Sequence, residues 1–236
     1  MKKEIIDELT TLSEEEKQNI IKKHLENGVL MPIQSAIFIG RNVEIESGAI
    51  ILPGCVLTGG TKIGKGAHIG PDTWAYNTVI GAEASLNNVQ SYDSVVGDGA
   101  DIGPYVQIRP GSHIGSGVHL GNFVEVKNSA IDEGTKVSHL TYVGDSDVGK
   151  NVNFGCGCVT VNYTGKEKFR TTIGDYAFIG CNTNLVAPVK IGDYGYTAAG
   201  STITDDVPEN ALGIARARQV NKEGWVLEKK PYKFMK

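Results

Sequence analysis

Apolar residues recur at six-residue intervals over most of this chain. They occupy this phase from residue 39 to residue 69 and from residue 102 to residue 126, and the phase continues to Ile203. A period of six is the signature of a parallel β-helix, in which each side of a coil sends one apolar residue into a narrow core. Three such sides predict coils of eighteen residues, so residues eighteen apart should lie on neighbouring coils.

Small residues and glycine follow the apolar positions in a regular way. Four residues after most of them stands a small or β-branched residue, such as Ala49, Cys55 or Ala67, so bulky and small side chains alternate in the core. Glycine often comes directly after the apolar residue, where the coil turns a corner with backbone angles that a Cβ resists. This accounts for 30 glycines in 236 residues and predicts an all-β solenoid whose coils stabilise one another.

The repeat divides the chain into three segments. Residues 1–28 lie outside it and are predicted to form one short helix, or two, because Ser13 and Glu16 make a capping-box pattern and Asn27-Gly28 is a natural stop. The β-helix is predicted over residues 29–206, with a polar loop at residues 160–172. Residues 207–236 leave the repeat as a basic, partly apolar tail. We expect this tail to pack along the solenoid or onto a neighbouring subunit.

The charge balance argues against two classes of partner. The chain has 23 basic and 27 acidic residues, a net charge of −4 and no polybasic run, so we expect no binding to nucleic acid. No apolar stretch approaches the roughly 18 residues of a membrane span, and the N-terminus lacks the apolar region of a secretory signal. We therefore expect a cytoplasmic protein that does not bind membranes.

The cysteines predict neither disulfides nor a metal site. Four of them, Cys55, Cys156, Cys158 and Cys181, are too few and too irregularly spaced for a disulfide framework. The Cys156-x-Cys158 pair lacks a second pair at the spacing of a zinc site. We interpret all four as reduced thiols that fill small positions, and we expect no bound metal.

Two cations are predicted to stack on neighbouring coils. Arg109 and Lys127 are eighteen residues apart and each stands second in its hexad, so they should share one face at about one strand spacing, ~4.8 Å. Like charges at that separation repel each other unless an anion binds between them. The pattern favours an anion site, although two solvated side chains that extend outward would satisfy it as well.

A second column combines a histidine with small residues. When the loop at 160–172 is counted as one side, the third places of successive hexads are His139, Cys156, Cys181 and Ala199. One imidazole then stands at the end of a surface on which an extended ligand can lie close to backbone N–H groups. The alternative is a surface histidine beside ordinary corner residues.

Further polar residues lie near this column in the sequence. They supply hydroxyl, amide and ammonium groups that suit a sugar with several hydroxyls and a phosphate, and they are Tyr142, Asn153, Asn162, Tyr163 and Lys168. Taken singly, each of them also fits a turn or a solvated loop residue.

A series of longer motifs carries a family resemblance. In order, they are IRPGSHIGSGVHLGNFVEVK, SHLTYVGD, VNFGCG, VNYTGKEKF, LVAPVKIGD, AAGSTITDDVPENAL and KEGW. The chain strongly resembles the C-terminal acetyltransferase domain of the bifunctional glucosamine-1-phosphate N-acetyltransferase / N-acetylglucosamine-1-phosphate uridyltransferase family over roughly residues 20–225. The resemblance implies a left-handed parallel β-helix, an exception to the right-handed crossover rule, and a homotrimer.

The resemblance also implies roles for the candidate residues. His139 resembles the catalytic base of the family. Positions that match its sugar and phosphate contacts are Arg109, Lys127, Tyr142, Asn153, Asn162, Tyr163 and Lys168, and those that match its acetyl-CoA contacts are Cys156, Cys181, Ala199 and Arg216. The resemblance implies alanine and serine at the positions of Cys156 and Cys181, so we expect the bulkier sulfur to be tolerated if these two residues act through their backbone and to alter coenzyme affinity if they do not.

The implied activity is transfer of acetyl from acetyl-CoA to the amine of glucosamine 1-phosphate in UDP-N-acetylglucosamine biosynthesis, without a metal. The 28 residues before the solenoid cannot build the uridyltransferase domain, so we expect no uridyl transfer and a possible separate uridyltransferase partner. Alternatives are acetyl transfer to another amino sugar, a catalytically silent trimeric scaffold, and a metal-dependent hydratase with three histidines around zinc. His113 and His119 are only six apart and fall on different sides, which weakens the last alternative.

Overall fold

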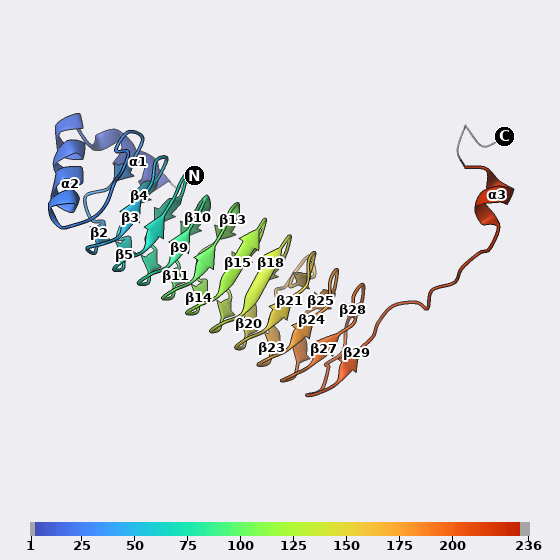
Figure 1. Cartoon of the computed structure of the whole chain (residues 1–236). Coiled ribbons are helices and arrows are strands. Elements are labelled where there is room, and N and C mark those ends of the chain that lie inside the picture. Colours follow the sequence, from blue (N-terminus) through green and yellow to red (C-terminus); the bar gives the residue numbers. More distant parts are fainter. Residues whose placement is uncertain (1–2, 232–236) are drawn as a thin grey trace.

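The chain folds as a left-handed parallel β-helix, as the repeat and the resemblance predict (Figure 1). The computed structural model describes residues 3–231. Residues 1–2 of the predicted helical segment and residues 232–236 of the predicted tail lie outside the described residues. Short parallel strands form three sheets of ten, nine and ten strands that run along the axis of the solenoid.

Successive strands of the chain belong to the three sheets in turn. The first sheet contains β1 (Phe38–Ile39), β4 (Val56–Thr58), β7 (Trp74–Tyr76), β10 (Val89–Tyr92), β13 (Val106–Ile108), β16 (Glu125–Lys127), β19 (Tyr142–Gly144), β22 (Val159–Val161), β25 (Asn184–Val186) and β28 (Thr202–Ile203). The second contains β2 (Glu44–Ile45), β5 (Lys62–Ile63), β8 (Val79–Ile80), β11 (Val95–Val96), β14 (His113–Ile114), β17 (Ala130–Ile131), β20 (Ser146–Val148), β23 (Thr171–Ile173) and β26 (Val189–Ile191). The third contains β3 (Ile50–Ile51), β6 (His68–Ile69), β9 (Ser85–Leu86), β12 (Asp101–Ile102), β15 (His119–Asn122), β18 (Lys136–His139), β21 (Asn153–Phe154), β24 (Phe178–Ile179), β27 (Tyr196–Thr197) and β29 (Leu212–Gly213).

The core is built from the repeating apolar residues. Ile51, Leu57 and Ile69 are fully buried, and so are the small residues Ala49 and Cys55 that stand four places after the preceding apolar positions. Each buried isoleucine or leucine stabilises the fold by about 1.5–3 kcal/mol relative to an exposed side chain. A single stack of such residues along the axis therefore makes every coil depend on its neighbours.

Corners between the sheets have two backbone requirements. At Gly64, a Cβ would lie 2.6 Å from the backbone nitrogen of Ala82 on the next coil, so only glycine allows the coils to approach this closely. The corners between the third and first sheets carry non-glycine residues at positive φ, namely Tyr105, Phe123 and Leu140. Their side chains are exposed, and Leu140 directly follows His139.

Two helices precede the solenoid, α1 (Lys3–Thr11) and α2 (Glu14–Glu26). The predicted capping box is present at the start of α2: the backbone N–H of Glu16 donates to the Ser13 hydroxyl, and the backbone N–H of Ser13 donates to the Glu16 carboxylate at 2.8 Å. The hydrogen bond from the Ser13 backbone, together with that from Arg41, lowers the pKa of Glu16 to about 2. Glu8 accepts hydrogen bonds from the backbone N–H groups of Arg41 and Gly59, which fixes α1 to the first coils.

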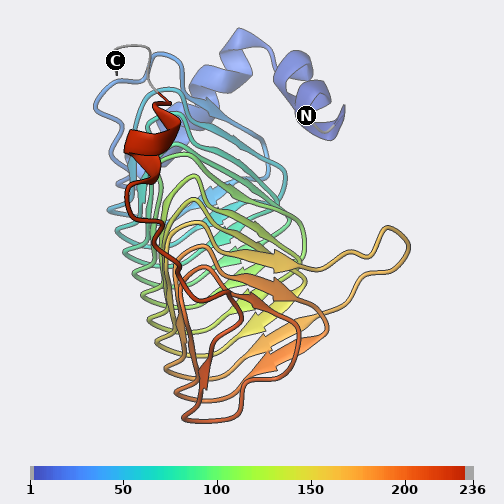
Figure 2. The same ribbon diagram turned by 90° about the vertical axis from the view of Figure 1, so that its right-hand side faces the viewer.

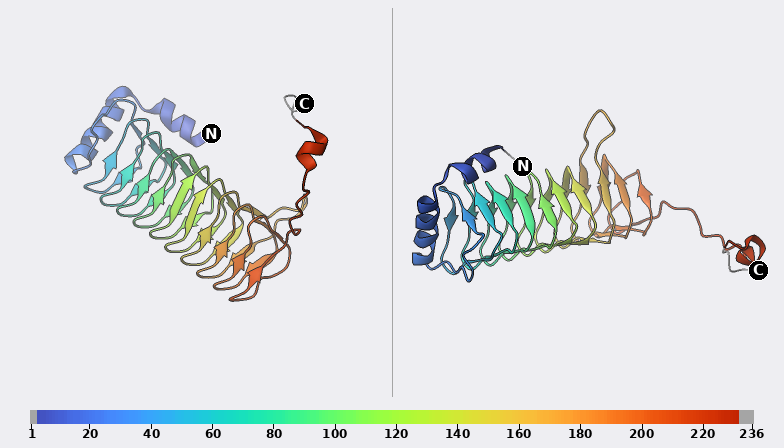
Figure 3. Two further views of the ribbon diagram at one scale, coloured as in Figure 1. Left: turned by 45° about the vertical axis from the view of Figure 1, so that its right-hand side comes forward. Right: turned by 90° about the horizontal axis from the view of Figure 1, so that it is seen from above.

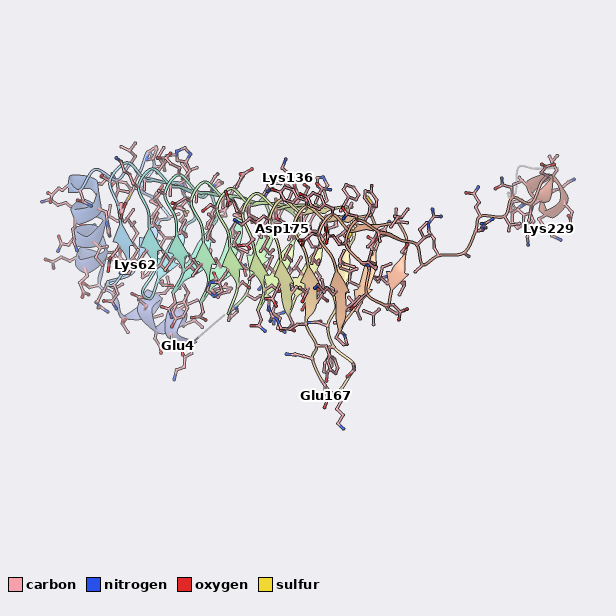
Figure 4. The ribbon with its side chains drawn as sticks, turned by 90° about the horizontal axis from the view of Figure 1, so that it is seen from below. Glu4, Lys62, Lys136, Glu167, Asp175 and Lys229 are labelled. Carbon is pink, nitrogen blue, oxygen red and sulfur yellow. The ribbon has the colours of Figure 1, made fainter. Side chains whose placement is uncertain are left out.

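The loop that leaves the solenoid is shorter than the sequence suggests. Val161 still pairs with Val186, and Thr171 already pairs with Ser146, so only residues 162–170 leave the sheets. Polar threonines at its ends make residues 160–172 look like one loop, but Thr160 and Thr171 are buried and belong to strands β22 and β23. Figure 2 shows the loop projecting from one side of the solenoid, and in Figure 4 Glu167 marks its projecting part.

The solenoid also continues beyond residue 206, where the sequence places its end. Strand β29 pairs with β27, and the backbone N–H of Thr202 donates to the carbonyl of Ala215. After Ala215 the chain extends away from the coils to a short helix, α3 (Trp225–Lys229), which buries none of its residues (Figure 3). Of the predicted tail, residues 207–215 thus pack on their own solenoid, whereas residues 217–231 do not. No helix within residues 3–231 is long and apolar enough to cross a membrane.

Candidate active site

The predicted pair of cations lies at the C-terminal ends of two neighbouring strands of the first sheet, β13 and β16. Ile108 pairs with Val126, which places Arg109 level with Lys127 on the next coil. Each cation contacts a carboxylate: Arg109 Nη1 lies 2.7 Å from Glu125, and Lys127 Nζ lies 3.4 Å from Asp145. The six-residue spacing identified the cations but not these two acidic partners, which reduce the repulsion within the stack.

The loop adds a third cation to the same place. The Lys168 side chain lies next to Lys127, and this proximity and the charge of Lys127, with a smaller effect of Arg109, hold the pKa of Lys168 below its ordinary value. Burial acts to lower the pKa of Lys127, but the contacts with Lys168 and Asp145 outweigh it and raise that pKa. Three basic side chains, two of them paired with carboxylates, thus gather at one place, where an anion would relieve their repulsion.

Asp145 lies beneath the three cations. Its side chain accepts a hydrogen bond from Asn128 Nδ2 at 2.6 Å and a short one from Asn162 Nδ2. Burial acts to raise the pKa of Asp145, but the hydrogen bonds from the two asparagines and the charge of Lys127 outweigh it, so the pKa lies below the ordinary value. Asn162 also donates to the Tyr142 hydroxyl at 3.4 Å, so the predicted sugar residues Asn162 and Tyr142 are in contact.

The predicted histidine column is present in the third sheet. Asn122 pairs with His139, and the N–H of Leu140 donates to the Asn122 carbonyl. The same pattern repeats on the following coils, because Gly157 N–H donates to His139, Asn182 N–H to Cys156 and Gly200 N–H to Cys181. His139, Cys156, Cys181 and Ala199 are therefore stacked in register, as the count through the loop predicts.

The small residues of this column offer backbone donors. Within residues 3–231, the N–H groups of Cys156, Cys181 and Ala199 have no hydrogen-bond acceptor. Some of the equivalent N–H groups at the corner between the second and third sheets do have one: those of Lys150 and Asp175 donate to carboxylates at 2.8 and 2.9 Å, whereas those of Ser116 and Glu133 have none among the described residues. Donors at this place in the coil thus attract an oxygen, and the column next to His139 leaves three of them available to a ligand.

Remaining predicted site residues lie around these two features. Asn153 is half-buried on β21, on the coil after His139, and Tyr163 is exposed in the loop, where it pairs with Lys168. Arg216 lies beside Ala199, the last member of the column: a Cβ placed on the neighbouring Gly200 would be 3.8 Å from Arg216 Cδ. The structure thus joins Tyr142 to Asn162 and Tyr163 to Lys168, and it places Arg216 at the far end of the column from His139, three strand spacings or roughly 14 Å away.

His139 occupies the junction of the two surfaces. Its strand, β18, lies in the third sheet, and the chain continues from it directly into β19, the strand of Tyr142 next to the Lys127 strand. The column of N–H donors starts at this corner and continues on the following coils, and β19 leads from this corner to Asp145, which contacts Lys127 of the cation cluster.

No metal centre accompanies this arrangement in the described part of the chain. No three histidine, cysteine, aspartate or glutamate side chains there are grouped so that they can hold a metal ion. His119 is instead paired with Asp101 at 3.0 Å.

Known proteins share both the repeat and most of this sequence. A family model described as bacterial transferase hexapeptide (six repeats) matches residues 93–128 and 170–205. The bifunctional protein GlmU of Thermoanaerobacter pseudethanolicus is 54% identical over 213 residues, which cover 90% of this chain and 47% of that protein. GlmU of a Geobacillus species is 50% identical over 224 residues, 94% of this chain and 49% of that protein. The chain belongs to the acetyltransferase part of the GlmU family.

It is accordingly an acyltransferase of the hexapeptide class. The chain spans about half the length of the GlmU proteins that it matches. Among solved structures, the UDP-N-acetylglucosamine acyltransferase of Francisella novicida covers 87% of this chain and 75% of its own, at 16% identity and a TM-score of 0.45. This likeness is too low to support a conclusion about substrate.

Proposed function

We propose that this chain transfers an acetyl group from acetyl-CoA to the 2-amino group of glucosamine 1-phosphate, a step in UDP-N-acetylglucosamine biosynthesis. The observation that supports the proposal most directly is that His139 heads a row of free backbone N–H groups and that the next strand of the chain, β19, leads to the cluster of three basic side chains. The first suits the phosphate of the acceptor, and the second suits the acyl donor.

The acceptor is held by charge and by hydroxyl recognition. Its phosphate binds Arg109, Lys127 and Lys168, because a dianion relieves the repulsion among the three cations. Its sugar hydroxyls contact polar side chains on both sides of the loop base, namely Tyr142, Asn153, Asn162 and Tyr163. The amine then points to the corner that carries His139.

The donor extends along the column of small residues. Acetyl-CoA lies against Cys156, Cys181 and Ala199, whose backbone N–H groups are free, and reaches Arg216 at the end of the solenoid. Cys156 and Cys181 act through their backbone in this proposal. The sulfur that replaces the smaller residues of other family members is then tolerated.

The reaction is a direct transfer. The amine nitrogen attacks the thioester carbonyl as His139 takes its proton, and such assistance is typically worth ~10²–10⁴-fold in rate. Backbone N–H donors stabilise the tetrahedral oxyanion, each by roughly 3 kcal/mol. The carbon–sulfur bond then breaks, and the imidazolium returns the proton to the coenzyme thiolate. Because no side chain carries the acetyl group, the kinetics should not be ping-pong.

The assembly that we propose is a homotrimer. Hexapeptide β-helix acyltransferases are typically trimers that act on small molecules. One chain offers the coenzyme a single wall, the column from Cys156 to Ala199, and an exposed Arg216 beside it. A neighbouring subunit would supply the opposite wall.

A substrate panel tests this function. The purified protein is incubated with acetyl-CoA and an acceptor while free coenzyme thiol is measured. Glucosamine 1-phosphate should release thiol, and free glucosamine should react poorly because it lacks the group that binds Arg109, Lys127 and Lys168. Equal use of both sugars would contradict the phosphate site. Faster turnover of another phosphorylated amino sugar would identify that sugar as the acceptor, and no turnover with any acceptor would favour a silent scaffold.

A further inference from the structure

A buried acidic residue lies in a site that favours anions. Asp145 follows β19 at the corner where the first sheet meets the second, and it is only 4% exposed. Its carboxylate is close to Lys127, which the proposed function assigns to the acceptor phosphate. A negative charge in this position opposes the binding of a phosphate, so its presence calls for a reason other than charge.

The contacts of Asp145 join three parts of the site. Its carboxylate binds Lys127 at the end of β16, Asn128 just after that strand, and Asn162 at the start of the loop. Its backbone N–H donates to the Lys127 carbonyl at 2.9 Å, and its own carbonyl accepts from the N–H of Thr171 at the end of the loop. One residue therefore holds a cation of the phosphate site and both ends of the loop that carries Lys168.

We propose that Asp145 is a positioning residue for the acceptor site: it fixes the ammonium group of Lys127 and the amide of Asn162, and thereby the loop that brings Lys168 and Tyr163 to the acceptor. This inference rests on the proposed function, because it takes the cation cluster as the phosphate site. Asp145 itself does not touch the substrate.

A positioning role and a purely electrostatic role of Asp145 predict opposite changes in phosphate affinity when the carboxylate is replaced. Asp145→Asn removes one negative charge from the cation cluster. If the carboxylate only neutralised charge, the variant would bind phosphate more tightly. If the carboxylate positions the cluster, its amide replacement keeps an acceptor for only one of the two asparagines and presents an NH2 donor to the other, so the network is broken at that point and phosphate binding weakens.

Asp147→Asn is the matched control. Asp147 lies two residues further on, is exposed, and holds Arg170 near the end of the same loop through a hydrogen bond of 2.9 Å to Arg170 Nε. Arg170 keeps hydrogen bonds to the carbonyls of Asn128 and Ser146 when Asp147 is replaced. The control thus perturbs the loop without touching Lys127 or Asn162.

Steady-state kinetics provide the first test. Asp145→Asn should raise KM for glucosamine 1-phosphate by roughly tenfold or more, as expected for losing hydrogen bonds between charged groups, and should leave KM for acetyl-CoA within about twofold. Asp147→Asn should change either constant by less than about threefold. An unchanged or lower acceptor KM in Asp145→Asn, or equal effects of the two substitutions, would overturn the proposal.

Two measurements keep the test independent of turnover and of folding. Titration with inorganic phosphate should show weaker binding to Asp145→Asn than to the unaltered protein, and trypsin should cleave after Lys166 faster in that variant because the loop is released. If Asp145→Asn fails to fold, Asp145→Glu replaces it, with the same expected signs because the longer side chain misplaces the carboxylate. Should the unaltered protein fail to acetylate glucosamine 1-phosphate, the proposed function falls. Trypsin cleavage at an unchanged rate would instead overturn the positioning role.

Discussion

At the scale of single residues, His139 is distinguished by its neighbours rather than by its burial. It is exposed, and the described residues give its carbonyl two partners, the N–H of Gly157 and the Thr141 hydroxyl, which fix the backbone at the corner. On the coil that follows, Cys156 offers a free N–H group. A base that is accessible on a rigid corner can serve the reaction without supporting the core.

His139→Ala should therefore abolish most turnover and spare the fold. We expect kcat to fall by about 10²–10⁴-fold, the usual contribution of a general base, with little change in the melting temperature because the side chain is exposed. His113→Ala is the control, since His113 is also exposed but lies on the second sheet. A His139→Ala enzyme with nearly normal kcat would remove this residue from the mechanism.

The lowered pKa of Lys168 predicts a pH dependence of acceptor binding. Lys168 is a cation only below its pKa, which contact with Lys127 and the charge of Arg109 hold below the ordinary lysine value. KM for glucosamine 1-phosphate should therefore rise with increasing pH before an ordinary lysine would lose its charge. Lys168→Arg keeps its charge throughout this range, so its KM should rise less steeply. Changes in the substrate's own ionisation are common to both proteins, and identical pH profiles would contradict the assignment.

The residues that the sequence could not identify act through side-chain contacts. The six-residue period predicts the stacking of Arg109 on Lys127 and the column from His139 to Ala199. It does so because the backbone of a solenoid fixes which residues lie next to each other on neighbouring coils. Asp145 does not follow from the count, since its partners Asn128 and Asn162 approach it by a corner and a loop. The spacing shows which residues share a face, but not which donors turn toward a buried carboxylate.

At the scale of elements, the period predicts the strands well and their ends less well. Thr160 and Thr171 look like loop residues because they are polar, yet the coil buries both: the Thr160 hydroxyl donates to the Gly144 carbonyl, and the backbone N–H of Thr171 donates to the Asp145 carbonyl. The end at residue 206 was placed too early for a similar reason. Leu212 remains on a sheet although its side chain is exposed and carries no core signal.

Helix α2 closes the N-terminal end of the solenoid. Ile20, Ile21 and Leu25 pack against the core, and Arg41 on the first coils forms an ion pair with Glu16 at 2.9 Å. A solenoid needs such a terminal element because its last coil would otherwise expose core side chains. The start of this helix is therefore a local determinant of stability at that end.

Ser13→Ala should destabilise this end without unfolding the rest. Removal of an N-cap hydroxyl typically costs about 1 kcal/mol. We expect faster hydrogen exchange in α2 and in the first coils, and unchanged exchange near His139. Thr10→Ala at the end of α1 is the control, since Thr10 is exposed and its hydroxyl bonds only within its own helix. Uniformly faster exchange over all coils would show that the helix is not a local cap.

The stability of α2 at the N-terminal end of the solenoid should decrease at low pH. The pKa of Glu16 is lowered from 4.5 to about 2, chiefly by the Ser13 backbone and by Arg41. A carboxyl with a depressed pKa stabilises the folded state above its unfolded pKa, and this contribution is lost as the pH falls toward about 2. Protection of α2 against hydrogen exchange, corrected for intrinsic rates, should therefore decrease between pH 4.5 and pH 2, and it should decrease less in Glu16→Gln.

At the scale of the whole molecule, the solenoid places the two proposed binding regions along one axis. The cation cluster forms on the coils of β13, β16 and β19, and Arg216 follows β29 at the end of the solenoid. From β13 to β28 there are five strand spacings, or roughly 24 Å, which suits an acceptor and an extended coenzyme bound end to end. The tail beyond Arg216 is exposed and points away from these coils (Figure 1).

The tail has apolar residues that its own chain leaves uncovered. Trp225, Val226 and Leu227 lie on one short helix and are all exposed, Leu227 at 73%. Exposed apolar residues on a terminal extension are typical of a segment that packs on another chain. In the proposed trimer, the tail would cover a neighbouring subunit near the coenzyme, which explains why it does not return to its own coils.

Truncation after Ala215 tests this arrangement. Within residues 3–231, Ala215 is the last residue that is hydrogen-bonded to the solenoid, since its carbonyl accepts from the Thr202 N–H and its N–H donates to the Ser201 hydroxyl. The β-helix signal in circular dichroism should therefore persist. The cut removes Arg216 and the tail helix, and the affinity for acetyl-CoA should fall by roughly tenfold or more, about 1.4 kcal/mol or greater. Arg216→Ala keeps the tail and should lose only part of this affinity, whereas sedimentation should show a weaker trimer for the truncated chain alone. A truncated protein that binds the coenzyme normally, or a monomer with full activity, would show that one chain builds the whole site and that the tail serves another purpose.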